Sequence, residues 1–237
     1  MFFDPLYWLV IGIGMVLSIW ASMKTKGTFH KYSEYTTRSR MTGAQVAEAI
    51  LRDNNISDVQ IVPIKGNLTD HYDPRSKVLR LSEGVFGSTS MSAAGVAAHE
   101  VGHAIQHAQG YAPLKFRSAW VPVANIGGGL SMFVLMGALF MGGAATVMGS
   151  KLALAGVLLF ATTTLFTLVT LPVEFDASRR ALATLKRGSY LAPDELTGAK
   201  KVLDAAALTY VAAFMTSALT LLYWMMRLGL LGGRRSD

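Results

Sequence analysis

The chain contains no cysteine among its 237 residues. This absence excludes disulfide bonds and thiolate metal ligands, so any bound zinc ion must be held by histidine nitrogen and carboxylate oxygen atoms. Charged residues are also scarce, at 16% against 51% hydrophobic residues, and this balance is more apolar than that of a usual soluble protein. The composition therefore indicates a membrane protein.

The hydrophobic residues are concentrated in four long runs. A helix needs about 20 apolar residues to cross the hydrocarbon layer, and each run meets or approaches that length. The runs predict about four transmembrane helices, at residues 5–23, 118–150, 152–173 and 205–226. Because proline and glycine occur near the start of the second run, the sequence does not decide at which residue that helix begins. A buried all-α core is the alternative, but the length of the runs favours the membrane.

The first run is expected to be a retained membrane anchor. A cleaved signal peptide begins with basic residues, whereas here Lys24 and Lys26 follow the apolar run and Asp4 precedes it. The chain then divides into an anchor (1–23), an α+β segment (24–117), a helical hairpin (118–173), a short polar segment (174–204), and a last transmembrane helix with a tail (205–237).

The link between the second and third runs is predicted to be a tight turn at residues 149–151. A hairpin there returns the chain to the side that it left, so both polar segments face the same compartment. Both segments are rich in lysine and arginine, which predicts that they lie in the cytoplasm and that the protein is a multi-pass protein of the cell membrane. The basic tail, with Arg234 and Arg235, disagrees with this orientation, and the longer segments are given more weight.

The formal net charge of +7 does not predict a nucleic-acid partner. The basic residues flank the apolar runs, where anionic lipid headgroups supply the complementary charge. We therefore expect the lipid bilayer as a partner and no nucleic acid. Small residues allow close helix packing within the chain, or with a second copy or a membrane partner. They are Gly127, Gly128, Gly129, Gly142 and Gly143.

The first polar segment is predicted to fold as a small α+β unit. Residues 42–52 have apolar side chains at helical spacing. Residues 58–65 and 77–82 alternate apolar and polar side chains, which predicts two short strands. The second strand is a candidate edge strand for binding an extended peptide. Residues 92–108 are rich in alanine and follow serines that can cap a helix.

The alanine-rich helix carries an H-E-x-x-H pattern at His99, Glu100 and His103. Histidines four residues apart lie on one face of a helix, so their imidazoles can bind one zinc ion. Glu100 lies about 100° round the helix from His99, where it can hold a zinc-bound water and take its proton. Zinc lowers the pKa of such a water towards ~7 and polarises a scissile carbonyl. Glu100 is therefore the predicted catalytic base.

A catalytic zinc ion needs a third protein ligand and one open position. His107 is disfavoured because it lies about 12 Å along the helix axis from His99. Glu174 follows the third run, where the hairpin returns; the alternative is a carboxylate at the membrane interface that pairs with Arg179 or Arg180. We therefore predict Glu174 as the third ligand of one zinc ion per chain, with His71 as the alternative.

Four polar residues are candidates for supporting roles. Asp176 could hold a zinc-binding histidine in place, or it could be a surface charge. His71, Tyr72 and Arg179 could each stabilise an oxyanion, but each could equally be an ordinary loop residue. Spacing alone does not give their geometry.

Two segments of the sequence resemble a known family. Residues 97–106 read A-A-H-E-V-G-H-A-I-Q, and residues 171–178 read L-P-V-E-F-D-A-S. They are similar to the YugP-type membrane zinc metallopeptidases of bacteria, and the resemblance covers nearly the whole chain. It implies a gluzincin-like site, with His99, His103 and Glu174 as ligands and Glu100 as base. The broader group that resembles HtpX and the CAAX-prenyl endopeptidases carries an aspartate four residues after its ligand glutamate, where this chain has Ser178.

The sequence thus predicts a zinc-dependent endopeptidase in an α-helical integral membrane protein with a small α+β unit. Its expected substrates are peptides or membrane proteins at the cytoplasmic membrane face. Two alternatives stay open. One is a scaffold braced by zinc without catalysis, which has no use for Glu100, and the other is a metallohydrolase of a non-peptide substrate, which the same ligands allow.

Overall fold

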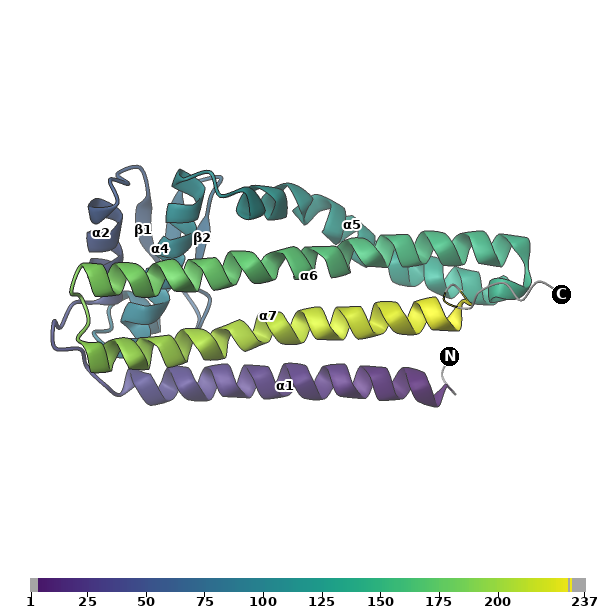
Figure 1. Cartoon of the computed structure of the whole chain (residues 1–237), viewed down its shortest axis with the longest axis horizontal. Coiled ribbons are helices and arrows are strands. Elements are labelled where there is room, and N and C mark those ends of the chain that lie inside the picture. The colour runs from purple at the N-terminus through teal and green to yellow at the C-terminus, as the bar shows by residue number, and fades with distance from the viewer. Residues whose placement is uncertain (1–3, 230, 232–237) are drawn as a thin grey trace. The chain divides into compact units, whose positions relative to one another are not determined.

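The structure is a computed structural model that describes residues 4–229 and 231. Its elements form two compact units. The first, called here the membrane bundle, comprises the described parts of residues 1–20, 116–170 and 210–237. The second, called here the polar unit, comprises residues 21–115 and 171–209. Helices α1, α5, α6 and α7, which are labelled in Figure 1, contribute residues to both units.

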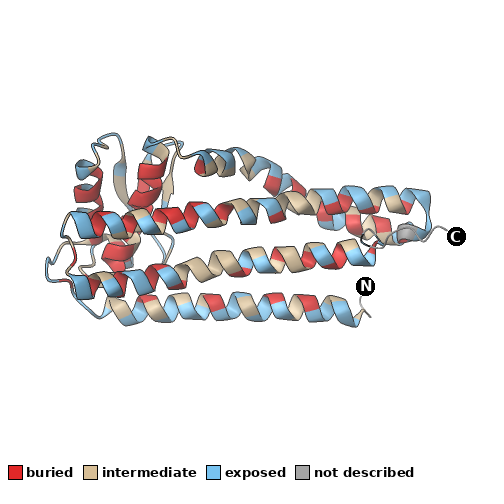
Figure 2. Ribbon diagram, in the orientation of Figure 1, coloured by how far each residue is buried: buried red, intermediate tan, exposed pale blue. Residues whose placement is uncertain are grey.

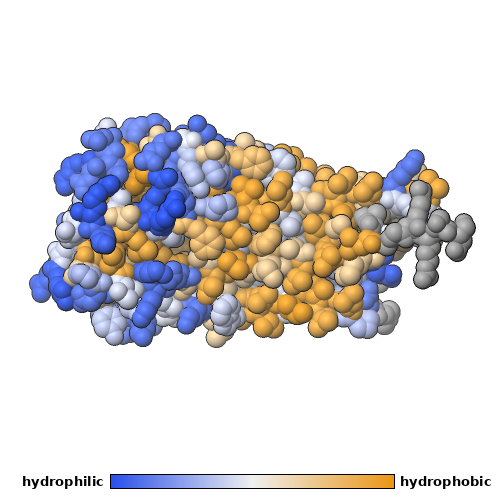
Figure 3. Space-filling view, in the orientation of Figure 1, coloured by the Kyte–Doolittle hydropathy of each residue, from blue (hydrophilic) through white to orange (hydrophobic). Residues whose placement is uncertain are grey.

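Four helices in the described part of the chain are long and apolar enough to cross a membrane. They are α1 (Pro5–Ser33), α5 (Ala112–Phe140), α6 (Val147–Arg187) and α7 (Pro193–Arg227). Many of their large apolar side chains are exposed, and Phe140 reaches 86%. Figures 2 and 3 show such exposed, hydrophobic surface along the membrane bundle. The prediction of an α-helical integral membrane protein with about four spans is confirmed.

The helices extend beyond the apolar runs. α1 continues to Ser33, and α6 runs without a break from the apolar run into the polar unit. The turn between α5 and α6 lies at residues 141–146 and contains the short 3-10 helix η1 (Gly143–Ala145). The turn predicted at residues 149–151 was wrong, since these residues lie in α6. Glycines form the observed turn, because Gly142 and Gly143 have positive φ angles of 90° and 57°, which glycine adopts without steric cost.

Hydroxyl and indole groups link neighbouring helices of the membrane bundle. Trp120 of α5 donates from Nε1 to the carbonyl oxygen of Thr162 in α6, at 3.0 Å. The hydroxyl groups of Thr167 in α6 and Ser217 in α7 are 2.9 Å apart. A Cβ atom at Gly127 would lie 2.1 Å from Oγ1 of Thr162. At Gly127, the predicted close packing therefore occurs within one chain.

The predicted basic tail residues, Arg234 and Arg235, lie outside the described residues.

The polar unit contains a small three-stranded sheet, as the α+β prediction requires. Strands β1 (Gln60–Ile64), β2 (His71–Asp73) and β3 (Val78–Ser82) have the order β1-β3-β2. β1 is parallel to β3, and β2 is antiparallel to it. β3 is therefore the central strand, and its predicted place at a sheet edge was wrong. The sequence did not predict β2, which has only three residues.

Helices α2 (Gly43–Asp53), α3 (Glu83–Phe86) and α4 (Met91–Ala108) complete the polar unit with the adjoining parts of α1, α5, α6 and α7. α4 begins at the cap Ser90, whose Oγ accepts a hydrogen bond from the backbone N–H of Ala93 at 3.2 Å. Its small residues are buried in the hydrophobic core. A Cβ atom at Gly102 would lie 2.5 Å from the carbonyl oxygen of Ala177 in α6. The glycine therefore allows α4 and α6 to pack backbone against backbone.

Candidate metal centre

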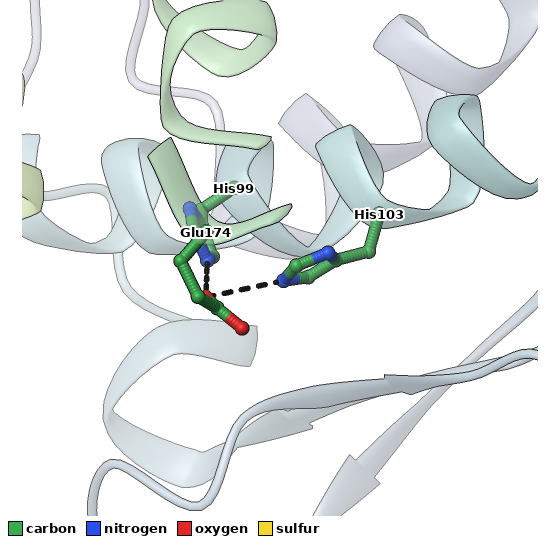
Figure 4. Close-up of side chains that lie close together, drawn as sticks. All are labelled: His99, His103 and Glu174. Atoms are coloured by element: carbon green, nitrogen blue, oxygen red, sulfur yellow. Dashed lines mark hydrogen bonds and ion pairs between the residues drawn. The ribbon is translucent and has the colours of Figure 1, made fainter. Parts of the chain in front are cut away.

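Three side chains of the polar unit converge where α4 meets α6. His99 and His103 project from one face of α4, and Glu174 projects from α6 (Figure 4). Oε2 of Glu174 is 3.2 Å from Nε2 of His99 and 3.5 Å from Nε2 of His103. One ligand atom from each residue can be chosen so that all three lie within 4.8 Å of one another. Among the described residues, this is the group that could hold a metal ion.

The centre attracts positive charge. Glu174 and His103 are buried, and His99 is partly buried. Burial alone lowers the pKa of His103, but the hydrogen bond with Glu174 and the charge of that carboxylate raise the pKa overall. The buried carboxylate therefore favours a cation in the space that it shares with the two imidazole rings.

In both histidines, the ring nitrogen Nδ1, which does not face Glu174, has a hydrogen-bond partner. Nδ1 of His99 is 3.1 Å from Oγ of Ser178, and Nδ1 of His103 is 3.0 Å from Oε1 of Gln106. Such partners fix the ring orientation of metal-binding histidines. The Nε2 atoms are the ones that face Glu174. Both imidazoles are thus held in the orientation that a metal ligand requires.

The residues present fit a zinc ion. Two imidazole nitrogens and one carboxylate oxygen form a common ligand set of catalytic zinc sites, which leaves a fourth position for water or substrate. The chain brings Glu174 to the histidine pair, while His71 and His107 are outside the group. The assignment of His99, His103 and Glu174 as zinc ligands remains a prediction that this geometry supports.

Glu100 lies beside the centre and outside the group of potential ligands. Glu100 is only 8% exposed. Burial raises the pKa of its carboxyl group, and nearby positive charge on His99 and His103 acts in the opposite direction. A carboxyl group with a raised pKa is well suited to accept and return a proton near neutral pH. The position agrees with the predicted role as base, which stays a prediction.

The proposed supporting residues have different surroundings. Nδ1 of the exposed His71 is 2.8 Å from the carbonyl oxygen of Thr69. The hydroxyl group of Tyr72 is 2.8 Å from Nδ1 of His107. Neither of these contacts is with His99, His103 or Glu174, so an oxyanion role for His71 or Tyr72 stays a prediction.

Asp176 and Arg179 are paired with each other. Asp176 also pairs with Arg180, and its Oδ2 accepts a hydrogen bond from Nε2 of Gln106 at 2.9 Å. Asp176 therefore reaches His103 through Gln106. The sequence interpretation missed Gln106 and Ser178 as partners of the histidines. A signal existed for Ser178, because it occupies the position of the aspartate in the broader group, and for Gln106, because a residue three positions after His103 shares its helix face.

The fold and the centre define a class, namely multi-pass membrane proteins with an H-E-x-x-H motif at a candidate metal site. The chain belongs to the family described as "Putative neutral zinc metallopeptidase", whose model matches residues 7–229. It is 43% identical over 210 residues to the "Putative membrane protease YugP" of Bacillus subtilis (strain 168), a match that covers 89% of this chain and 91% of the relative. No solved structure matches the chain. The resemblance drawn from the two sequence segments is confirmed, and the family implies zinc.

Proposed function

We propose that this chain is an endopeptidase that uses one zinc ion per chain to cleave polypeptides at the cytoplasmic face of the membrane. The observation that carries the proposal is the position of Glu100, buried beside three potential zinc ligands. Family membership supports zinc-dependent peptide hydrolysis. The name of the Bacillus subtilis relative supports a protease that acts at a membrane.

The residues of the chain supply the proton transfers of hydrolysis. His99, His103 and Glu174 would hold zinc, which when bound polarises the scissile carbonyl and lowers the pKa of water. The carboxylate of Glu100 accepts a proton from a water molecule while the water oxygen bonds to the carbonyl carbon. The same carboxyl group then gives this proton to the leaving nitrogen as the carbon–nitrogen bond breaks. A structural metal site needs no such base, so Glu100 favours catalysis over a scaffold.

The position of Glu174 supports action close to the membrane. It directly follows the apolar run 152–173 within the single helix α6. The next side chain, Phe175, is exposed. We therefore propose that the substrates are exposed or unfolded segments of polypeptides beside the membrane. Basic residues support a cytoplasmic location, because they are common in cytoplasmic segments near spans. They are Lys24, Lys26, Lys31, Lys115, Arg179, Arg180, Lys186 and Arg187.

The test is zinc content and casein cleavage by the full chain purified in detergent, for wild type, Glu100→Gln and Glu174→Ala. Wild type should contain one zinc ion and cleave casein. Glu100→Gln should keep its zinc and lose about 10²- to 10⁴-fold in rate, because only the base is removed. Glu174→Ala should lose both zinc and activity.

His71→Ala is the matched control, because it removes the alternative third ligand. It should keep zinc and activity. If it loses zinc while Glu174→Ala keeps it, the third ligand is His71. Cleavage by Glu100→Gln at the wild-type rate would refute the role of the base. A zinc-loaded wild type that cleaves neither casein nor other unfolded proteins would favour the scaffold or a non-peptide substrate.

A further inference from the structure

Two buried polar side chains, Gln106 and Asp176, are linked by hydrogen bonds to Nδ1 of His103. Gln106 of α4 is 0% exposed and Asp176 of α6 is 5% exposed. They are hydrogen-bonded to each other, with Gln106 between His103 and Asp176. Buried polar groups are costly unless their hydrogen bonds are satisfied. The contacts of this pair therefore constrain which way each group points.

The contacts of Gln106 fix the direction of its side-chain amide. Its Nε2 donates to the backbone carbonyl oxygen of Val173 at 2.8 Å and to Oδ2 of Asp176 at 2.9 Å. The backbone carbonyl oxygen can only accept, so this contact alone requires Nε2 to be the atom that faces it. If the amide were turned round, its oxygen would face two acceptors and both hydrogen bonds would be lost. The oxygen Oε1 must therefore be the atom that faces Nδ1 of His103.

Two arginines keep Asp176 an acceptor. Arg179 pairs with Oδ1 of Asp176, and Arg180 pairs with Oδ2. Arg180 also donates to Oε1 of Gln109 at 2.6 Å and lies over the ring of Tyr111, which anchors its guanidinium group near the end of α4. Charged partners on both oxygens favour the ionised carboxylate. Asp176 thus receives hydrogen bonds and cannot donate one to Gln106.

The fixed amide decides where the neutral imidazole of His103 carries its proton. Because Oε1 of Gln106 can only accept, Nδ1 of His103 must donate. The neutral ring then has its lone pair on Nε2, which is the atom that faces Glu174. His99 differs, because the hydroxyl group of Ser178 can either donate or accept. Only the partner of His103 imposes a single tautomer.

We infer that Gln106, oriented by Asp176, is a positioning residue that holds His103 with its proton on Nδ1 and its Nε2 lone pair ready for zinc. The inference rests on the metal centre of the proposed function and is independent of whether the substrate is a peptide. Loss of the outer partner of a zinc-binding histidine typically reduces metal affinity by about 10- to 100-fold. Gln106 should therefore control zinc affinity without touching the ion.

Gln106→Met tests the inference, because it keeps the approximate volume of the side chain and removes both polar ends. The full chain in detergent would be titrated with zinc against a chelator of known affinity. Zinc affinity should fall about 10- to 100-fold. Asp176→Asn should cause a smaller loss, because the Val173 carbonyl oxygen still orients the amide. Gln60→Met, at an exposed position on β1, is the matched control and should bind zinc as wild type does.

A second readout uses the metal-free protein. With ¹⁵N-labelled histidine, NMR distinguishes the two neutral tautomers, and the chain has only five histidines to assign. Glu174 faces Nε2 and favours a proton there as well, so Nδ1 of His103 should be protonated in wild type, whereas in Gln106→Met the neutral ring should carry its proton on Nε2. Unchanged zinc affinity and an unchanged tautomer in a folded Gln106→Met protein would overturn the inference. If wild type bound no zinc, the proposed metal centre would fail, and the tautomer would still test the role of Gln106.

Discussion

Ser178 supports His99 with a neutral hydroxyl group, at a position where the broader group of metallopeptidases carries an aspartate. A carboxylate partner makes an imidazole a stronger metal ligand than a hydroxyl group does. Ser178→Asp should therefore bind zinc at least as tightly as wild type, and Ser178→Ala should bind it about 10-fold less tightly. Chelator competition gives both affinities. Weaker binding by Ser178→Asp than by Ser178→Ala would show that the hydrogen bond to His99 does not support the ligand.

Single residues differed in how far the sequence could predict them. His99, Glu100 and His103 could be proposed from spacing alone, because one helical turn places them together whatever the rest of the chain does. Glu174 could be proposed because the hairpin returns the chain. The contact of Ser178 with His99, and that of Gln106 with Asp176, could not be assigned, because they depend on which face of α6 meets α4. That choice is made by packing between segments distant in sequence.

At the scale of elements, the close packing of α4 on α6 depends on Gly102. A methyl group there would lie 2.5 Å from the carbonyl oxygen of Ala177. This oxygen belongs to the backbone, so a change of side-chain rotamer cannot relieve the clash. Gly102→Ala should lower the stability of the folded protein by about 1–3 kcal/mol. Zinc affinity should fall as well, because α6 carries Glu174. Thermal unfolding in detergent and chelator competition measure the two effects.

Gly27→Ala provides the control for Gly102→Ala. Gly27 lies within α1, and a Cβ atom there would meet nothing within 4 Å. Alanine is a better helix former, so this change should raise stability by roughly 0.5–1 kcal/mol and leave zinc affinity unchanged. Equal effects of the two changes would mean that the contact between Gly102 and Ala177 does not limit the approach of the helices.

The sequence predicted which helices and strands form better than it predicted the residues at which they begin and end. Capping groups and periodicity allowed α4 to be placed almost to the residue. Hydropathy marks how much of a helix is apolar rather than where the helix stops, so the polar extensions of α1 and α6 were not predicted. The turn at residues 141–146 was missed because its glycine and alanine residues are as apolar as the spans. β2 has too few residues for alternation to show.

At the scale of the whole molecule, the proposed orientation can be tested with single cysteines, because the natural chain has none. Ser57 lies in the polar unit and Met141 lies in the turn after α5, and both are exposed. An impermeant maleimide applied to intact cells should label Met141→Cys and leave Ser57→Cys unlabelled until the membrane is opened. Labelling of Ser57→Cys in intact cells would place the metal centre outside the cytoplasm.

The two halves of the metal centre are made at different times during synthesis. His99 and Glu174 are 75 residues apart, and the intervening chain contains α5 and the apolar part of α6. A ribosome-bound chain that ends before Glu174 has the two histidines and the base but lacks the carboxylate. A complete candidate centre therefore cannot form until the hairpin has been synthesised.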